Sequence, residues 1–176
     1  MKIYRMTHRS DAWKSIQVAN TLIEEVLNNQ KSLEAADGAK CSWIEDKTNL
    51  EGFANAPFIF GSIPVVDTHA YNVLEPFMMG IKRSIISVAG EEYYILFSER
   101  PDPNLLDEKE SSIRRFSNGC IMDIKRYVFK TDKVPALFGI TQRPYYLFAT
   151  DDVVNAIREA GLTGFDFEEC HIANTH

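Results

Sequence analysis

The C-terminal part of the chain constrains the fold most, because it predicts a strand, a helix and a second strand in direct succession. The run YYLFA at residues 145–149 is apolar and strand-length, and Thr150 follows it as an N-cap with two aspartates in the first helical turn. Gly161 stands where a left-handed C-cap belongs, and residues 164–168 then alternate as a strand with both phenylalanines facing inward. No repeat, low-complexity tract or flexible linker divides the chain, so we expect one α+β domain.

Two further strand regions are predicted upstream of this ending. Residues 84–97 form an apolar hairpin whose second strand is too hydrophobic for an exposed edge, so the pair should lie in the middle of a sheet. Residues 120–129 alternate as one strand whose two faces are both mixed in polarity.

Two further helices are also predicted. One begins at Ser10, where apolar residues headed by Trp13 recur at helical spacing. The other begins with Asp67 or Thr68 as its cap and is kinked or ended by Pro76. The expected fold is therefore α+β, a mixed or mainly antiparallel sheet packed by a few helices.

Size and composition are those of an ordinary soluble protein. The chain has 176 residues, 45% of them apolar and 25% charged, so residues 1–176 are expected to form a single domain. The first residues are too charged for a signal peptide, and no apolar run approaches the roughly 18 residues of a membrane span. The three cysteines form no CxxC pair and are expected to be reduced thiols. These features favour a cytoplasmic protein that makes no membrane contact.

Motifs for enzyme chemistry are largely missing from the sequence. The closest pairing of site-forming residues is Asp67-Thr68-His69, which would suit a metal or hydrolase-like site if further ligands converged on it. A helix-capping aspartate beside a surface histidine explains the same residues more simply. Cys170 and His171 would point to opposite faces of a strand, and no GxSxG or phosphate-binding loop occurs. We therefore expect no enzyme activity, no cofactor and no metal. The alternative is a small ligand-binding or hydrolase-like domain that uses Asp67, His69 and Cys120.

Charge is segregated along the chain. Residues 91–110 hold seven carboxylates and two basic residues, residues 113–133 hold six basic and two acidic residues, and residues 151–171 hold six acids and one arginine. The net charge of −6 argues against a nucleic-acid ligand and fits a basic or neutral partner. Three interpretations stay open: ordinary solvated surface, convergence of both acidic segments into a patch that steers a basic partner, or neutralisation of that patch by the basic segment.

The second half of the chain resembles a known family. The similarity is carried by YYILFSERPDPNLLDEKESSIRRFSNGCIMDIKRYVF at residues 93–129 and by YLFATDDVVNAIREAGLTGFDFEE at residues 146–169. These runs are similar to a group of bacterial proteins known as immunity protein family eleven, formerly a domain of unknown function. The resemblance covers roughly residues 58–170 and leaves residues 1–57 as a variable N-terminal part. Its most telling residues are Tyr94, Leu106, Asp107, Ser111, Ile157, Gly161, Leu162, Thr163, Gly164 and Phe167.

The resemblance implies an immunity protein that binds a cognate toxin domain in the cytosol and neutralises it stoichiometrically. Such an inhibitor needs a complementary surface of about 800 Å² per partner rather than catalytic residues. The family pattern fixes no binding residue, and Asp107 and Ser111 could equally cap the turn that follows them. The candidate contacts therefore come from charge and aromatic content. They are Tyr93, Glu99, Asp102, Asp107, Glu108, Glu110 and Tyr145. A structural protein that forms a homodimer or homo-oligomer through an exposed strand edge is a further alternative.

Overall fold

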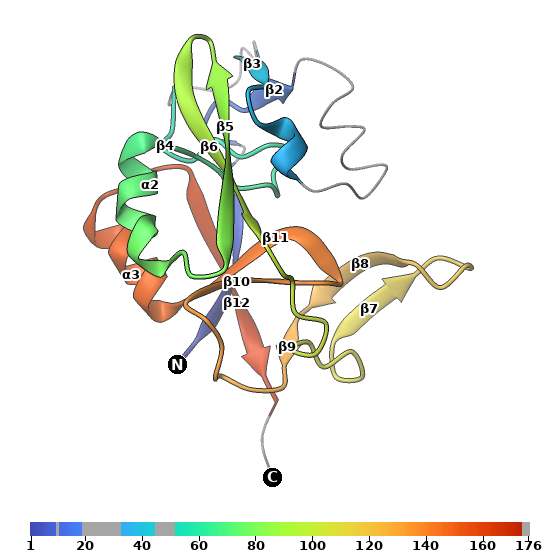
Figure 1. Cartoon of the computed structure of the whole chain (residues 1–176). Helices are drawn as coiled ribbons and strands as arrows, with labels where there is room; N and C mark the ends of the chain where they lie inside the picture. The colour runs from blue at the N-terminus through green and yellow to red at the C-terminus, as the bar shows by residue number, and fades with distance from the viewer. Residues whose placement is uncertain (10, 19–32, 45–51, 174–176) are drawn as a thin grey trace.

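Two curled five-stranded sheets and two short α-helices make up most of the described part of the chain (Figure 1). The structure is a computed structural model that describes residues 1–9, 11–18, 33–44 and 52–173. Within the described residues, strands dominate, each five-stranded sheet mixes parallel and antiparallel pairs, and the helix content is low. The α+β prediction is thus confirmed in its coarser form, as a small mainly β domain with mixed sheets. None of the described helices is both long and apolar enough to cross a membrane.

The first sheet gathers both ends of the described chain. Its central strand β1 pairs antiparallel with β11 on one side and with β12 on the other, so that Ile3 faces Thr150 and Cys170. Among its described strands, the one parallel pair joins β12 to the short strand β9. The strand order is β10 (Leu137–Ile140), β11 (Arg143–Thr150), β1 (Ile3–His8), β12 (Phe165–Ile172) and β9 (Val128–Phe129).

The second sheet is built around the predicted hairpin. Strands β5 and β6 pair in register from Ile81 opposite Ser98 to Val88 opposite Glu91. Neither strand lies at an edge, which confirms the prediction of a central hairpin. The strand order is β2 (Ile16–Val18), β3 (Lys40–Trp43), β5 (Ile81–Val88), β6 (Glu91–Ser98) and β4 (Val65–Asp67). The 3₁₀ helix η1 (Leu33–Ala36) is tied to β5 by the bond from Ser84 Oγ to the Leu33 carbonyl, at 2.8 Å.

Helix α2 (Thr68–Leu74) starts where the sequence predicts. Asp67 is its N-cap, and one carboxylate oxygen accepts a hydrogen bond from the Ala70 amide at 2.7 Å. A short 3₁₀ helix, η2 (Glu75–Phe77), follows directly and holds Pro76 in its first turn. Proline cannot donate the backbone hydrogen bond that would continue the α-helix, so α2 ends before it.

The strand–helix–strand ending is present as predicted. Strand β11 leads into α3 (Asp151–Glu159), and β12 follows it. Thr150 occupies the N-cap position but makes no side-chain hydrogen bond to the helix. Gly161 adopts a φ of +65°, and the amide of Leu162 bonds back to the Ile157 carbonyl at 3.1 Å, as in a left-handed C-cap.

Three apolar clusters hold these elements together. The largest lies between the two sheets and the two helices, where Val153, Val154 and Ile157 of α3 meet Leu96 and Leu147 of the sheets. A second cluster lies under η1, β3 and the hairpin. The third covers the opposite face of the first sheet with the rings of Phe129, Phe138 and Phe148, and it includes Leu106 of the loop that follows β6.

Two predicted elements differ in the structure. The prediction of a helix from Ser10 to about Leu27 is wrong over residues 11–18, of which Ile16–Val18 form strand β2 opposite β3. Residues 19–27 of that prediction lie outside the described residues. The single strand expected over residues 120–129 divides at Tyr127 into β8 (Ile121–Arg126) and β9. The physical reason is that the two parts pair with different partners, β8 with β7 (Ser112–Arg115) and β9 with β12.

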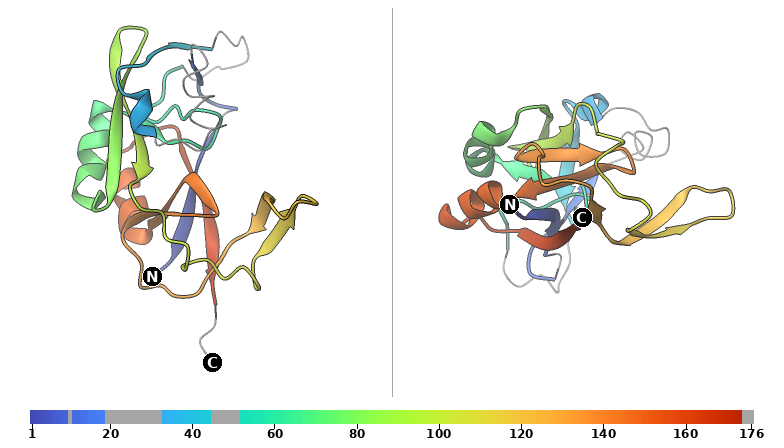
Figure 2. Two further views of the ribbon diagram at one scale, coloured as in Figure 1. Left: turned by 45° about the vertical axis from the view of Figure 1, so that its right-hand side comes forward. Right: turned by 90° about the horizontal axis from the view of Figure 1, so that it is seen from below.

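The β7–β8 hairpin forms a small separate sheet that projects from the body of the molecule (Figure 2). Both views in Figure 2 show this hairpin, coloured yellow, reaching beyond the two larger sheets. We call residues 112–126 the arm.

Candidate binding surface

The acidic segment that follows β6 is a loop with backbone hydrogen bonds to the body of the molecule near both ends. Near its start, the Asp102 amide bonds to the Gly139 carbonyl at 3.0 Å. Near its end, the Asp107 amide bonds to the Val128 carbonyl at 2.8 Å, and Leu106 between them is 1% exposed. We call residues 99–110 the acidic loop. These bonds and the buried Leu106 side chain anchor the acidic loop to the body of the molecule.

Asp107 organises the turn at the end of the acidic loop. Its Oδ1 atom accepts hydrogen bonds from the amides of Lys109 and Glu110, at 3.0 and 3.2 Å. The hydroxyl of buried Ser111 accepts a bond from the Val128 amide at 3.0 Å. Asp107 and Ser111 therefore have the structural roles that the sequence left open, as cap and anchor of this turn.

Glu108 and Glu110 connect the acidic loop to basic side chains of the arm. Glu108 forms an ion pair with Arg115 at 2.6 Å and accepts a hydrogen bond from Gln142 at 2.8 Å. The backbone carbonyl of Glu110 accepts a hydrogen bond from Arg126 at 2.6 Å. The side chain of Glu110 is exposed to solvent. The acidic loop and the arm thus form one continuous charged surface with both signs on it.

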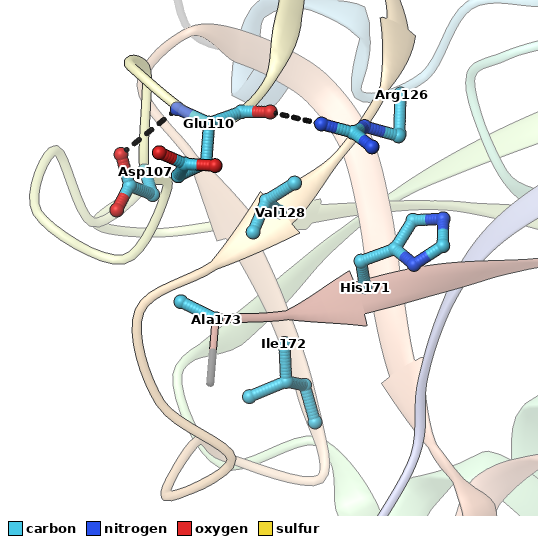
Figure 3. Close-up of a pocket in the computed structure, with 7 residues that line it drawn as sticks. All are labelled: Asp107, Glu110, Arg126, Val128, His171, Ile172 and Ala173. Atoms are coloured by element: carbon cyan, nitrogen blue, oxygen red, sulfur yellow. Dashed lines mark hydrogen bonds between the residues drawn. The ribbon is translucent and has the colours of Figure 1, made fainter. Parts of the chain in front are cut away.

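An open pocket of about 450 Å³ lies between the acidic loop and the end of the first sheet. Figure 3 shows Asp107 and Glu110 on one side of Val128, with Arg126 and His171 on its other side. Ile172 and Ala173 also line this pocket. A second pocket of about 400 Å³ also includes Asp107, with Pro103, Leu106, Glu108, Lys109 and Lys130 around it. Both are hollows of mixed polarity, suited to accept protruding side chains of a partner.

Three of the candidate contact residues lie apart from the acidic-loop turn. Glu99, directly after β6, pairs with Lys82 at 3.2 Å, and the hydrogen bonds that the Lys82 ammonium donates to Glu34 and Glu99 raise the pKa of that lysine. Tyr93 is 9% exposed and packs edge-on against Trp43, and burial raises its pKa. Tyr145 is half-buried against the second apolar cluster, which contains Tyr93. The structure therefore brings Asp102, Asp107, Glu108 and Glu110 together and places Tyr93 and Tyr145 in the packing of the second sheet.

The alternative site at Asp67 and His69 has a structural explanation. Both Asp67 carboxylate oxygens are engaged, one by the Ala70 amide and the other by Asn55 Nδ2 at 2.8 Å. His69 is exposed in the first turn of α2. Within the described ranges, no three His, Cys, Asp or Glu side chains come close enough together to hold a metal ion.

The three cysteines occupy different environments. Cys41 and Cys170 are buried, and Cys120 is exposed near the tip of the arm. Burial raises the pKa of the Cys170 thiol to about 12, so this thiol stays protonated at neutral pH.

Much of the acidic surface is neutralised locally. In the second acidic segment, Glu168 pairs with Arg5 at 2.7 Å and Glu169 with Lys2 at 2.8 Å. In the first segment, Glu108 pairs with Arg115 of the basic segment. These pairs favour internal neutralisation over one large negative patch. Asp102, Asp107 and Glu110 make no ion pair to a side chain within the described residues.

Sequence reasoning missed a stack of cationic and aromatic side chains beside the arm. The Arg5 guanidinium lies 5.6 Å from the ring centre of Tyr127 and 5.4 Å from that of Tyr146. Arg143 lies 5.8 Å from the same Tyr146 ring and donates a bond to the Met122 carbonyl of the arm at 3.0 Å. Burial raises the pKa of Tyr127, opposed by Arg5. These residues come from distant parts of the chain, so no local pattern points to them.

No family model matches this chain, and no curated protein matches it.

Proposed function

We propose that this chain is an immunity-type protein that binds a cognate toxin domain and neutralises it by stoichiometric contact in the cytoplasm. The observation that carries the proposal is the acidic loop, anchored to the body by backbone hydrogen bonds and joined to the projecting arm by the Glu108–Arg115 ion pair. Preorganised charged surfaces lower the entropic cost of association and favour one partner over others. The resemblance that we infer from the sequence of residues 93–129, which include both elements, points to the same assignment.

The toxin surface that meets the acidic loop is proposed to be basic. Asp102, Asp107 and Glu110 lack side-chain ion pairs within the described part of the chain, so their charge is available to a partner. The two pockets that border Asp107 would accept protruding partner side chains. Complementary charge at such a site raises the association rate and is weakened by salt. In this proposal the protein performs no catalysis and needs no cofactor.

Co-expression tests this function directly. The chain is expressed with each polymorphic toxin domain encoded immediately upstream of it, and growth rescue and co-purification are scored. Rescue with a stable one-to-one complex supports the proposal, and absence of rescue and of complex with every neighbour contradicts it.

A pair of variants then tests the surface. The double reversal Glu108→Lys and Glu110→Lys should weaken the complex and reduce the dependence of its affinity on salt. The matched control reverses two exposed helical carboxylates, Glu75→Lys and Glu159→Lys. Unchanged affinity and salt dependence in the first variant would show that the acidic loop is not the contact surface. Thermal unfolding of both variants establishes that they are folded.

A further inference from the structure

The arm carries positive charge within an acidic protein. Residues 112–126 contain four basic residues and one acid, whereas the whole chain has a net charge of −6. Arg114 lies 4.0 Å from the one acid, Asp123, and Arg115 is paired with Glu108. Lys125 is exposed and makes no ion pair to any described residue. The arm therefore presents a modest positive field that differs in sign from most of the surface.

The tip of the arm exposes two large apolar side chains. Phe116 is 51% exposed and Met122 is 41% exposed. The turn between them is ordered by its own bonds, from the Phe116 amide to the Cys120 carbonyl and from the Gly119 amide to the Phe116 carbonyl, both at 2.9 Å. Phe116 is thus a solvent-exposed aromatic residue at the start of a hydrogen-bonded turn. Aromatic side chains are typical anchors of protein interfaces.

The flank of the arm is fixed to the body. Ile113 and Ile124 pack in the third apolar cluster. Arg126 of the arm donates a hydrogen bond to the Glu110 carbonyl, and Arg143 of the body donates one to the Met122 carbonyl of the arm. An isolated two-stranded hairpin is marginally stable in water, so these contacts are what allow the arm to persist beyond the body. A partner would therefore meet the arm in the conformation seen here, with little ordering cost.

The strand pairing within the arm disfavours association through its edges. The β7–β8 register shifts between Ser112 and Ile113 and again between Arg114 and Arg115. Bulges of this kind disrupt the ladder that an additional strand would need. Contact through the side chains of the tip is favoured over addition of a strand from a second copy.

We propose that the arm inserts into an acidic cleft with an apolar floor on the partner protein, with Phe116 as its anchor and Arg114 and Lys125 facing carboxylates at the rim. This inference rests on the proposed function and names the chemistry of the partner site that the arm contacts. A nucleic-acid ligand is disfavoured because the chain is acidic overall, with a net charge of −6. Such a site would bury the exposed Phe116 ring and pair the basic side chains of the arm with carboxylates, so it accounts for both the exposed aromatic residue and the positive charge of the arm.

The experiment compares arm variants in the complex with the toxin domain that wild-type protein neutralises. Phe116→Ser and the double variant Arg114→Glu with Lys125→Glu should each weaken binding about tenfold or more. The matched controls are Met79→Ser, which changes an 82% exposed apolar residue elsewhere, and Lys40→Glu, which reverses an exposed strand lysine. Cys120 provides an independent readout, because insertion should slow its reaction with a maleimide in the complex. Wild-type protein is also titrated with a labelled single-stranded oligonucleotide.

Each result decides a different point. Loss of affinity in the arm variants only, with protection of Cys120, supports insertion. A wild-type complex that the arm variants form equally well, with Cys120 still reactive, overturns the insertion and leaves the proposed function intact. Failure of wild-type protein to bind any neighbouring toxin overturns both. Oligonucleotide binding that is lost in the arm variants, while toxin binding is kept, assigns the arm to nucleic acid and also overturns the inference.

Discussion

Glu108 of the acidic loop and Arg115 of the arm form an ion pair in which the two side-chain atoms lie 2.6 Å apart. The carboxylate also accepts a hydrogen bond from Gln142 in the turn between β10 and β11. One glutamate thus joins three segments that are distant in the sequence: the loop, the arm and the first sheet. This contact and the bond from Arg126 to the Glu110 carbonyl both link the loop to the arm.

Replacement of this carboxylate should cost little stability. Both side chains are about two-fifths exposed, at 43% and 41%, and exposed ion pairs contribute about 0.2–1 kcal/mol. We expect Glu108→Gln to lower the free energy of unfolding by less than about 1 kcal/mol in urea titrations, and the loss to shrink in high salt. Glu169→Gln, which breaks the exposed pair with Lys2, is the control. A much larger loss for Glu108→Gln would mean that the pair holds the arm in place.

Asn55 should contribute more, because it ties three parts of the fold together. Its Oδ1 accepts two bonds from Thr163, both at 3.0 Å, and its Nδ2 donates to the carboxylate that caps α2. Replacement by alanine leaves these partly buried groups without partners, and we expect a loss of about 1–3 kcal/mol in the free energy of unfolding. Asn72→Ala, on the exposed side of α2, should have almost no effect. Equal effects of the two variants would contradict this role.

Gly164 is required both by its backbone conformation and by the space around it. Its φ is +91°, and a Cβ atom there would lie 2.3 Å from the Ala56 carbonyl oxygen. Gly161 has a similar φ of +65° but open space around it. We expect Gly161→Ala to cost about 1–2 kcal/mol from strain alone. Gly164→Ala should cost clearly more, because the clash with backbone is added to the strain. Urea unfolding of both variants measures the difference, and equal losses would show that the backbone at Ala56 can move aside.

Local signals in the sequence predicted the elements that local physics determines. The Asp67 cap, the Gly161 C-cap and the central hairpin each depend on residues a few positions apart, and each is present. The helix predicted from Ser10 failed at Ile16, because that residue pairs with Trp43 of β3. Spacing alone cannot distinguish an apolar residue on a helix from one that pairs across a sheet.

The candidate contacts divide in the same way. Asp102, Asp107, Glu108 and Glu110 are close in sequence, so charge counting placed them on one surface and the loop holds them there. The aromatic candidate Tyr93 is instead buried against Trp43 of β3. Because β3 comes from a distant part of the chain, the sequence around Tyr93 does not predict this burial. The exposed Phe116 was not among the candidates, because only the projection of the arm reveals its exposure.

Acidification should destabilise the protein through His8. This half-buried ring stacks on Phe58, and its Nδ1 lies 3.0 Å from the Gly164 carbonyl oxygen. Burial lowers the pKa of His8 below its usual 6.5, opposed by nearby backbone carbonyls and by Asp11. The unfolded chain therefore binds this proton more readily than the folded chain, so stability is complete above pH 6.5 and falls as the pH drops below it. Melting temperatures measured between about pH 7.5 and pH 5 should show this loss.

The contribution of His8 can be isolated with a variant that does not titrate. His8→Gln should flatten the pH dependence of the melting temperature, even if its stability at neutral pH is lower. His69→Gln changes an exposed histidine and should leave the dependence as in the wild type. A wild-type dependence that survives in His8→Gln would assign the effect to other groups.

Thiol chemistry should single out Cys120. Cys120 is exposed near the tip of the arm, whereas Cys41 and Cys170 are buried and burial raises the Cys170 pKa to about 12. Because the thiolate is the reactive form, a maleimide at neutral pH should add once to the folded protein, and Cys120→Ser should take up none. Peptide mass spectrometry locates the adduct, and addition of denaturant should expose the other two thiols. Rapid labelling of Cys170 in the folded protein would contradict its burial between β1 and β9, and with it the packing that supports the arm.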